Sequence, residues 1–202
     1  MIKTVNLMAF ICALIFTFSV VISHVLKTEL NWVNDTLSQY ALGYNGFIIT
    51  IGFYCIGFTQ VLLASSFMNL HRASTSKGSL LLFVAGLGIF IVALFPTQPA
   101  SAEMIGRLPH IVGAGVHFLL FPLAVLVLTP SLHKGLLRRY SFITGYVSLL
   151  FFIILLVLFL IKPWFEIPFF GLLEKINVLI INTWLLVFSY NRSWYFQSGK
   201  CN

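Results

Sequence analysis

The sequence predicts an all-α, multi-pass membrane protein, a bundle of six transmembrane helices with both termini in the cytoplasm. Of its 202 residues, 59% are hydrophobic and only 8% are charged, whereas soluble domains carry about 25% charged residues. The mean hydropathy is +1.00. Six apolar runs divide the chain, and a helix needs roughly 20 such residues to cross a bilayer core. The composition therefore excludes an ordinary soluble domain.

The distribution of charge between these runs predicts the orientation. The N-terminal stub, the gaps 69–78 and 131–141 and the C-terminal tail contain no acid but eight cations: Lys3, Arg72, Lys77, Lys134, Arg138, Arg139, Arg192 and Lys200. The other three gaps contain all five acids: Glu29, Asp35, Glu103, Glu166 and Glu174. Cytoplasmic loops of membrane proteins are enriched in Lys and Arg. The net charge of +7 therefore indicates topology and contact with lipid headgroups, and we expect no nucleic-acid partner.

We expect one domain, residues 1–202, with helices at residues 7–26, 47–68, 79–95, 110–128, 142–161 and 168–190. The first run is longer than the roughly 7–15 apolar residues of a signal peptide, so it is expected to be a retained helix. Small residues at helical spacing in the second, third and fourth helices let backbones approach closely, which predicts that these three form the packed centre. The fifth is apolar all round and is expected to face lipid.

The sixth helix decides where two charges lie. Its apolar part, 176–190, is short for a membrane span, and starting the helix at Pro168 gives it enough length. Proline suits a first helical turn. This start places Glu174 and Lys175 below the membrane interface, whereas a later start leaves them in a loop.

Topology also separates the five histidines. His71 and His133 fall in basic cytoplasmic gaps, whereas His24, His110 and His117 fall in the outer half of the protein. His110 and His117 are seven residues apart, so they lie on one helix face about 10 Å apart in height. Ionisable groups at this depth usually face the interior of a bundle or a wet cavity.

These residues predict a polar pocket at the outer face, lined by helices one, four and six and the first outer loop. Ser19, Ser23 and His24 are its expected contribution from the first helix. The candidate catalytic residues are Ser38, His110 and His117, and the candidate binding residues are Asp35, Tyr40, Arg107, Glu174 and Asn177. The alternative is that such side chains only form hydrogen bonds between helices, each contributing about 0.6–2 kcal/mol.

Several functions fit such a pocket. The leading hypothesis is a protein of the inner (cytoplasmic) membrane that binds or handles a lipid or other amphiphile, with Arg107 at a phosphate headgroup. An intramembrane hydrolase would use Ser38 as nucleophile and His110 as base, oriented by Asp35 or Glu103. A small carrier would titrate His117 and Glu174, and a purely structural role also fits.

The expected partners are membrane lipids, and a homo-oligomer is left open. A metal site would draw on His24, His110, His117 and Glu174. The spacing of seven between two of the histidines is not the i, i+4 pair with which one helix holds an ion. We therefore predict no metal and no cofactor.

Three short stretches resemble the domain-of-unknown-function family 998, six-helix membrane proteins of bacteria and archaea. Leu37-Ser38-Gln39-Tyr40-Ala41-Leu42-Gly43 with Gly46-Phe47 is similar to the family's first loop, Leu94-Phe95-Pro96-Thr97-Gln98-Pro99 to its Phe-Pro-Thr-Asp-Pro stretch, and Gly106 to His110 to its Gly-x-x-His motif. The first loop more distantly resembles Frag1/DRAM/Sfk1-like proteins. The resemblance covers residues 7 to 190 and implies the fold but no activity. Gln98 stands where the family pattern has Asp, so Asp35 or Glu103 would have to replace that acid in a catalytic set.

Overall fold

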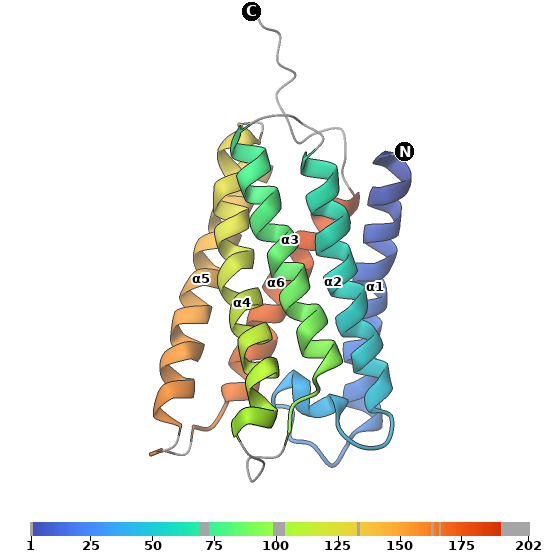
Figure 1. Cartoon of the computed structure of the whole chain (residues 1–202), viewed down its shortest axis with the longest axis vertical. Helices are drawn as coiled ribbons and strands as arrows, with labels where there is room; N and C mark the ends of the chain where they lie inside the picture. Colours follow the sequence, from blue (N-terminus) through green and yellow to red (C-terminus); the bar gives the residue numbers. More distant parts are fainter. Residues whose placement is uncertain are drawn as a thin grey trace, which may run out of the picture.

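The computed structural model describes residues 2–68, 73–98, 104–132, 134–162, 164–165 and 167–190. Six long helices run up and down through one bundle (Figure 1): α1 (Ile2–Leu26), α2 (Gly46–Met68), α3 (Ala73–Leu94), α4 (Met104–Leu128), α5 (Leu136–Ile161) and α6 (Phe170–Tyr190). All six are long and apolar enough to cross a membrane. The predicted class, an all-α multi-pass membrane protein with six spanning helices, is confirmed.

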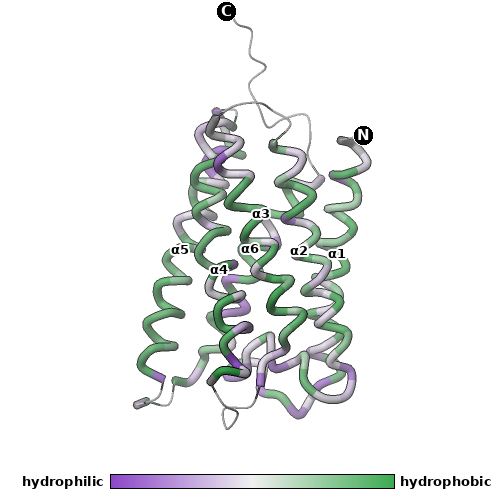
Figure 2. Tube along the Cα trace, viewed as in Figure 1, coloured by the Kyte–Doolittle hydropathy of each residue, from purple (hydrophilic) through white to green (hydrophobic). Residues whose placement is uncertain are grey.

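Hydrophobic residues follow the helices, and many hydrophilic residues gather in the connections at one end of the bundle (Figure 2). This end holds the short 3-10 helix η1 (Leu37–Ala41) and is called the η1 end below. The start of α1 and the end of α6 lie together at the opposite end, where the Phe10 and Tyr190 rings are 5.5 Å apart. A second 3-10 helix, η2 (Thr129–Ser131), follows α4 at that end.

Four helices begin five or six residues before their predicted apolar runs. The structure starts α1 at Ile2, α3 at Ala73, α4 at Met104 and α5 at Leu136, whereas the apolar runs predict starts at 7, 79, 110 and 142. Their first turns carry polar or basic residues, which a search for apolar runs leaves out. Since α6 begins at Phe170, it includes Glu174, so this acid belongs to the spanning helix.

Glycines bring the central helices into backbone contact. A Cβ atom on Gly86 of α3 would lie 3.0 Å from the Gly57 oxygen of α2, and one on Gly88 would lie 2.7 Å from the Gly113 oxygen of α4. Small residues allow such approach where lipid offers no hydrophobic drive for association. The packed centre predicted for helices two, three and four is confirmed.

The attachment of α5 is confined mainly to its first half. Ser141 accepts a hydrogen bond from Trp184 Nε1 at 3.0 Å, and Ser148 donates one to Asn177 Oδ1 at 2.7 Å. In the second half only Leu155 is buried. The second half of α5 therefore packs loosely, and the cavity described below lies between it and helices α4 and α6.

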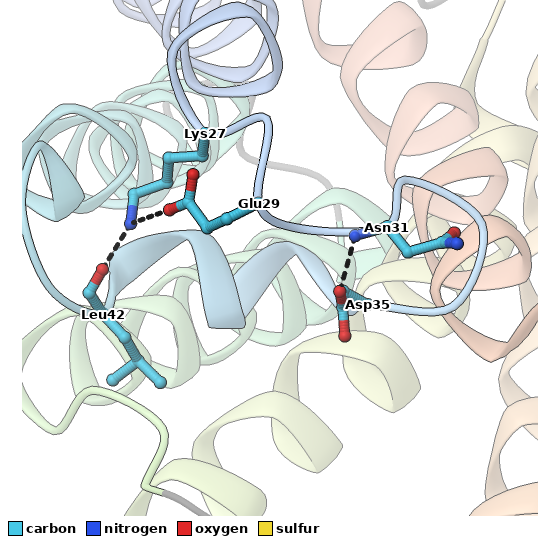
Figure 3. Close-up of polar contacts among 5 residues, drawn as sticks. All are labelled: Lys27, Glu29, Asn31, Asp35 and Leu42. Atoms are coloured by element: carbon cyan, nitrogen blue, oxygen red, sulfur yellow. Dashed lines mark hydrogen bonds and ion pairs between the residues drawn. The ribbon is translucent and has the colours of Figure 1, made fainter.

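The segment between α1 and α2 folds across the η1 end. Leu37 is 1% exposed and anchors η1 in the core. The buried Lys27 ammonium donates to the Leu42 carbonyl and lies 3.9 Å from Glu29, and the Asn31 amide donates to Asp35 Oδ2 at 2.7 Å (Figure 3). These contacts hold the loop as a fixed cover over part of the bundle.

Candidate functional site

A cavity of about 380 Å³ lies at the η1 end, between η1 and helices α4, α5 and α6, with a floor from α2 and α3. Small-molecule sites typically measure about 300–1,000 Å³. Most of the lining is apolar. Its polar side chains include Ser38, Arg107, His110, His117, Lys162 and Glu174. The cavity therefore combines charge with an apolar interior.

One wall of the cavity is a stripe of apolar side chains on α5. Phe152, Leu155, Leu156 and Phe159 line it, at the i, i+3, i+4, i+7 spacing of one helix face. The exposed fractions of Leu156 and Phe159 are 43% and 38%, so this wall also borders the lipid side. Other side chains of this half of α5, such as Ile153, Val157 and Leu160, are exposed as expected of a lipid-facing helix, and the cavity-facing stripe was not predicted because it is equally apolar.

His110 has a defined tautomer. Its Nδ1 lies 2.8 Å from the Phe95 carbonyl oxygen at the end of α3, and the Val92 carbonyl lies against the same ring. Carbonyl oxygens only accept hydrogen bonds, so Nδ1 carries the proton, and in the neutral imidazole Nε2 is an acceptor. His110 is 8% exposed and lines the cavity. The contact fixes the ring orientation as a hydrogen-bonded partner does for a general base.

His117 lies deeper, on the cavity floor, and is 2% exposed. Its Nδ1 is 3.4 Å from the amide nitrogen of Gln60 on α2, and the Ala85 carbonyl of α3 is a second partner. Sequence reasoning missed Gln60, although a lone amide within an apolar run was a usable signal. The pair of contacts fills the bonding capacity of a neutral imidazole.

Glu174 projects from the first turns of α6 into the cavity. The Leu37 amide of η1 donates to its carboxyl group. Its Oε2 atom is buried and, within the described part of the chain, has no hydrogen-bond partner. The ammonium groups of Lys162 and Lys175 act on it only electrostatically. A buried carboxyl oxygen without a partner is costly, so it marks a position that a ligand or water can satisfy.

Ser38 lines the same cavity as His110. Its Oγ lies 3.1 Å from Thr36 Oγ1, and the described residues contain no hydrogen bond between Ser38 and His110. The structure thus brings five predicted site residues to one cavity, Ser38, Arg107, His110, His117 and Glu174. Lys162, which sequence reasoning did not select, joins them at the end of α5.

The other predicted site residues lie outside the cavity lining. Tyr40 is 1% exposed, stacks on His24 with ring centroids 4.4 Å apart and lies under the Lys175 ammonium. Burial, and then the negative charges of Asp35 and Glu29, raise the pKa of Tyr40. Asp35 instead fixes the loop, since its carbonyl accepts from Lys175.

Asn177 is fully buried and accepts a hydrogen bond from Ser148, so it joins α5 to α6. The first helix contributes only Phe16 to the lining, and Ser19, Ser23 and His24 lie elsewhere. Of the predicted lining elements, helix one therefore takes a smaller part than α4, α6 and η1, and α5, which was not predicted, lines the cavity with four side chains. Glu103, His71 and His133 lie outside the described residues.

Across the described ranges, no three His, Cys, Asp or Glu side chains come together as metal ligands. His24, His110, His117 and Glu174 therefore form no such cluster in this structure. What the cavity offers is a set of hydrogen-bonding and charged groups above an apolar interior.

The fold and the cavity define a class: a multi-pass membrane protein with six spanning helices among its described residues and an amphipathic cavity at the end opposite the start of α1 and the end of α6. The chain belongs to the family described as "Protein of unknown function (DUF998)", which matches residues 10–191. The predicted family is thereby confirmed. No curated protein and no solved structure matches the chain.

Proposed function

We propose that this protein binds a lipid or other amphiphile in the cavity at the η1 end. The observation that carries the proposal is the division of the lining into a charged rim, with Arg107 and Lys162, and an apolar wall on α5. A membrane amphiphile has the same two parts in the same order. The partial exposure of Leu156 and Phe159 supports entry of the chain from the bilayer.

We further propose that the η1 end faces the outside of the cytoplasmic membrane. The supporting observation is the charge of the opposite end, where Lys77 lies near the start of α3 and Arg138 and Arg139 lie near the start of α5, with no acid in the first turns of these helices. Such an excess of cations is typical of cytoplasmic loops. The bound headgroup then belongs to the outer leaflet.

Cysteine labelling in intact cells tests the orientation. Tyr44 is 90% exposed at the η1 end, so we expect Tyr44→Cys to react with a membrane-impermeant maleimide in a background where Cys12 and Cys55 are serine. The natural Cys201 of the C-terminal tail is the internal control and should react only after permeabilisation. Labelling of Cys201 but not of position 44 in intact cells would reverse the orientation.

A cavity-filling substitution tests amphiphile binding. Gly115 lines the cavity, and a Cβ atom there meets nothing within 4 Å, so Gly115→Phe should occupy the cavity without breaking helix packing. Val112→Phe is the matched control, because Val112 is 49% exposed and lies outside the lining. Lipids that co-purify with each protein are then quantified by mass spectrometry.

We expect wild type and Val112→Phe to retain the same enriched amphiphile, and Gly115→Phe to lose it. Equal lipid profiles in all three proteins would contradict binding in the cavity. Thermal unfolding of the three proteins in one detergent shows whether they are folded alike, so that a loss of lipid is assigned to the filled cavity.

A second candidate is an intramembrane hydrolase in which Ser38 is the nucleophile and His110 the base. It is favoured by one observation: both residues line one cavity, and the Phe95 carbonyl orients His110 with Nε2 as the acceptor. Ser38→Ala should then abolish release of fatty acid or headgroup from added lipids while lipid binding persists. Thr36→Ala is the control and should keep the turnover of wild type. Unchanged turnover in Ser38→Ala would exclude this role.

A further inference from the structure

The polar groups of the cavity lie in a fixed order along the helices. Lys162 directly follows the end of α5, and Arg107 lies in the first turn of α4, so both cations are at the rim. His110 is one helical turn deeper than Arg107, about 4.5 Å, and Glu174 lies about 6 Å inside the start of α6. The wall from Phe159 to Phe152 continues inward as apolar side chains only.

The middle level of this order presents hydrogen-bond acceptors. Glu174 Oε2 is buried and has no partner in the described ranges, and His110 keeps Nε2 as an acceptor because Nδ1 bonds to Phe95. A ligand whose phosphate binds the cationic rim and whose chain lies on the apolar wall passes these acceptors with the part between phosphate and chain. That part must carry a hydrogen-bond donor to satisfy them. This requirement separates the common classes of phospholipid.

Diacyl phospholipids do not meet it, because both remaining glycerol oxygens are esterified and carry no proton. The ammonium of an ethanolamine headgroup lies on the water side of the phosphate, away from the chains. A lysophospholipid has one acyl chain and a free glycerol hydroxyl between the chain and the phosphate. The single apolar stripe on α5 likewise matches one chain.

We infer that the cavity selects a single-chain glycerophospholipid, with its phosphate at Arg107 and Lys162 and its free hydroxyl donating to Glu174. The inference rests on the proposed function and names its ligand class. Guanidinium and ammonium groups bind phosphate through charge-assisted hydrogen bonds. The hydroxyl satisfies the carboxyl oxygen to which no residue in the described part of the chain donates.

Ligand analogues test the inference on the unaltered protein. The detergent-solubilised protein is titrated with lysophosphatidylglycerol, with the same lipid carrying a methyl ether on the free chain-side hydroxyl, and with diacyl phosphatidylglycerol, and binding is measured by native mass spectrometry. We expect the free hydroxyl to improve affinity about ten-fold over the methyl ether, the effect of one hydrogen bond to an otherwise unsatisfied buried group. Diacyl lipid should bind no better than the ether.

Substitution of the acceptor provides the second arm. Glu174→Leu should bind lysophospholipid and its methyl ether equally, because the group that distinguishes them is gone. Replacing a buried charge with an apolar residue of similar size is often tolerated. Glu29→Leu is the matched control, since Glu29 is an acid at the same end, 66% exposed and outside the lining. This control should discriminate as wild type does.

The outcomes separate the two proposals. Equal binding of lysophospholipid and its methyl ether to wild type, or tighter binding of diacyl lipid, overturns the inference while cavity binding can still stand. Binding that Gly115→Phe leaves unchanged overturns the proposed function and the inference together. If Glu174→Leu does not fold, the comparison of ligands on wild type decides alone.

Discussion

Replacing Gly88 with alanine should weaken the contact between α3 and α4. The added Cβ would lie 2.7 Å from the Gly113 oxygen and 3.0 Å from the His117 nitrogen, and ordinary contacts begin near 3.4 Å. Both obstructing atoms belong to the α4 backbone, so no side-chain rotation relieves them. The two helices must separate by several tenths of an ångström.

The magnitude follows from two opposing terms. Alanine improves helix propensity over glycine by about 1 kcal/mol, whereas overpacking costs about 1–3 kcal/mol, so Gly88→Ala should lower the free energy of unfolding by a net amount of up to about 2 kcal/mol. Gly115→Ala is the matched control on α4, because its Cβ meets nothing within 4 Å. Both variants share the propensity term, so the difference between them isolates the steric cost.

Thermal unfolding of both variants in the same detergent, followed by circular dichroism, measures this difference. A cost of about 2 kcal/mol corresponds to roughly 4–8 °C in the unfolding midpoint for a chain of this size. Gly88→Ala should unfold below wild type and Gly115→Ala at or above it. If Gly88→Ala is as stable as Gly115→Ala, the close backbone contact does not govern packing at this interface.

Two further predictions concern polar groups. Ser148→Ala leaves the buried Asn177 carbonyl without its donor and should cost about 1 kcal/mol of unfolding free energy, whereas Thr183→Ala on the exposed side of α6 should cost little. Because burial and the charge of Asp35 raise the pKa of Tyr40, its contribution to stability is complete below the ordinary tyrosine pKa of about 10 and falls at higher pH. Tyr40→Phe should lack this alkaline loss in chemical unfolding between pH 8 and 11, and an identical loss in both proteins would contradict it.

The fold was largely predictable because the bilayer imposes simple rules. A spanning helix needs a long apolar run, and the six runs gave six helices. Helix starts were less predictable, since the first turns of α3, α4 and α5 lie where charged residues are tolerated. The close pairs Gly57–Gly86 and Gly88–Gly113 followed the small-residue stripes, because only small side chains permit backbone contact.

The site was only partly predictable. Depth along the helices indicated His110, His117 and Glu174, and all three line the cavity. Position along the chain does not specify which direction a side chain takes in three dimensions. Asp35 and Tyr40 were therefore predicted to line the pocket, whereas in the structure Asp35 holds the loop and Tyr40 packs against His24. The contribution of α5 had no signal in its sequence, since a run that is apolar on every face gives no indication of which face meets a cavity.

If the cavity binds an amphiphile as proposed, the loosely packed second half of α5 also determines where selectivity can arise. An acyl chain that moves from the bilayer to the α5 stripe exchanges one apolar surrounding for another, so the transfer provides no hydrophobic drive. Discrimination between lipids must then come from protein groups that the bilayer interior does not offer. These are the cations at the rim and the hydrogen-bond acceptors below them. We therefore expect Lys162→Gln to reduce amphiphile affinity more than Leu156→Val does in the same binding measurement. The reverse order would mean that the shape of the apolar wall, rather than the charged rim, selects the ligand.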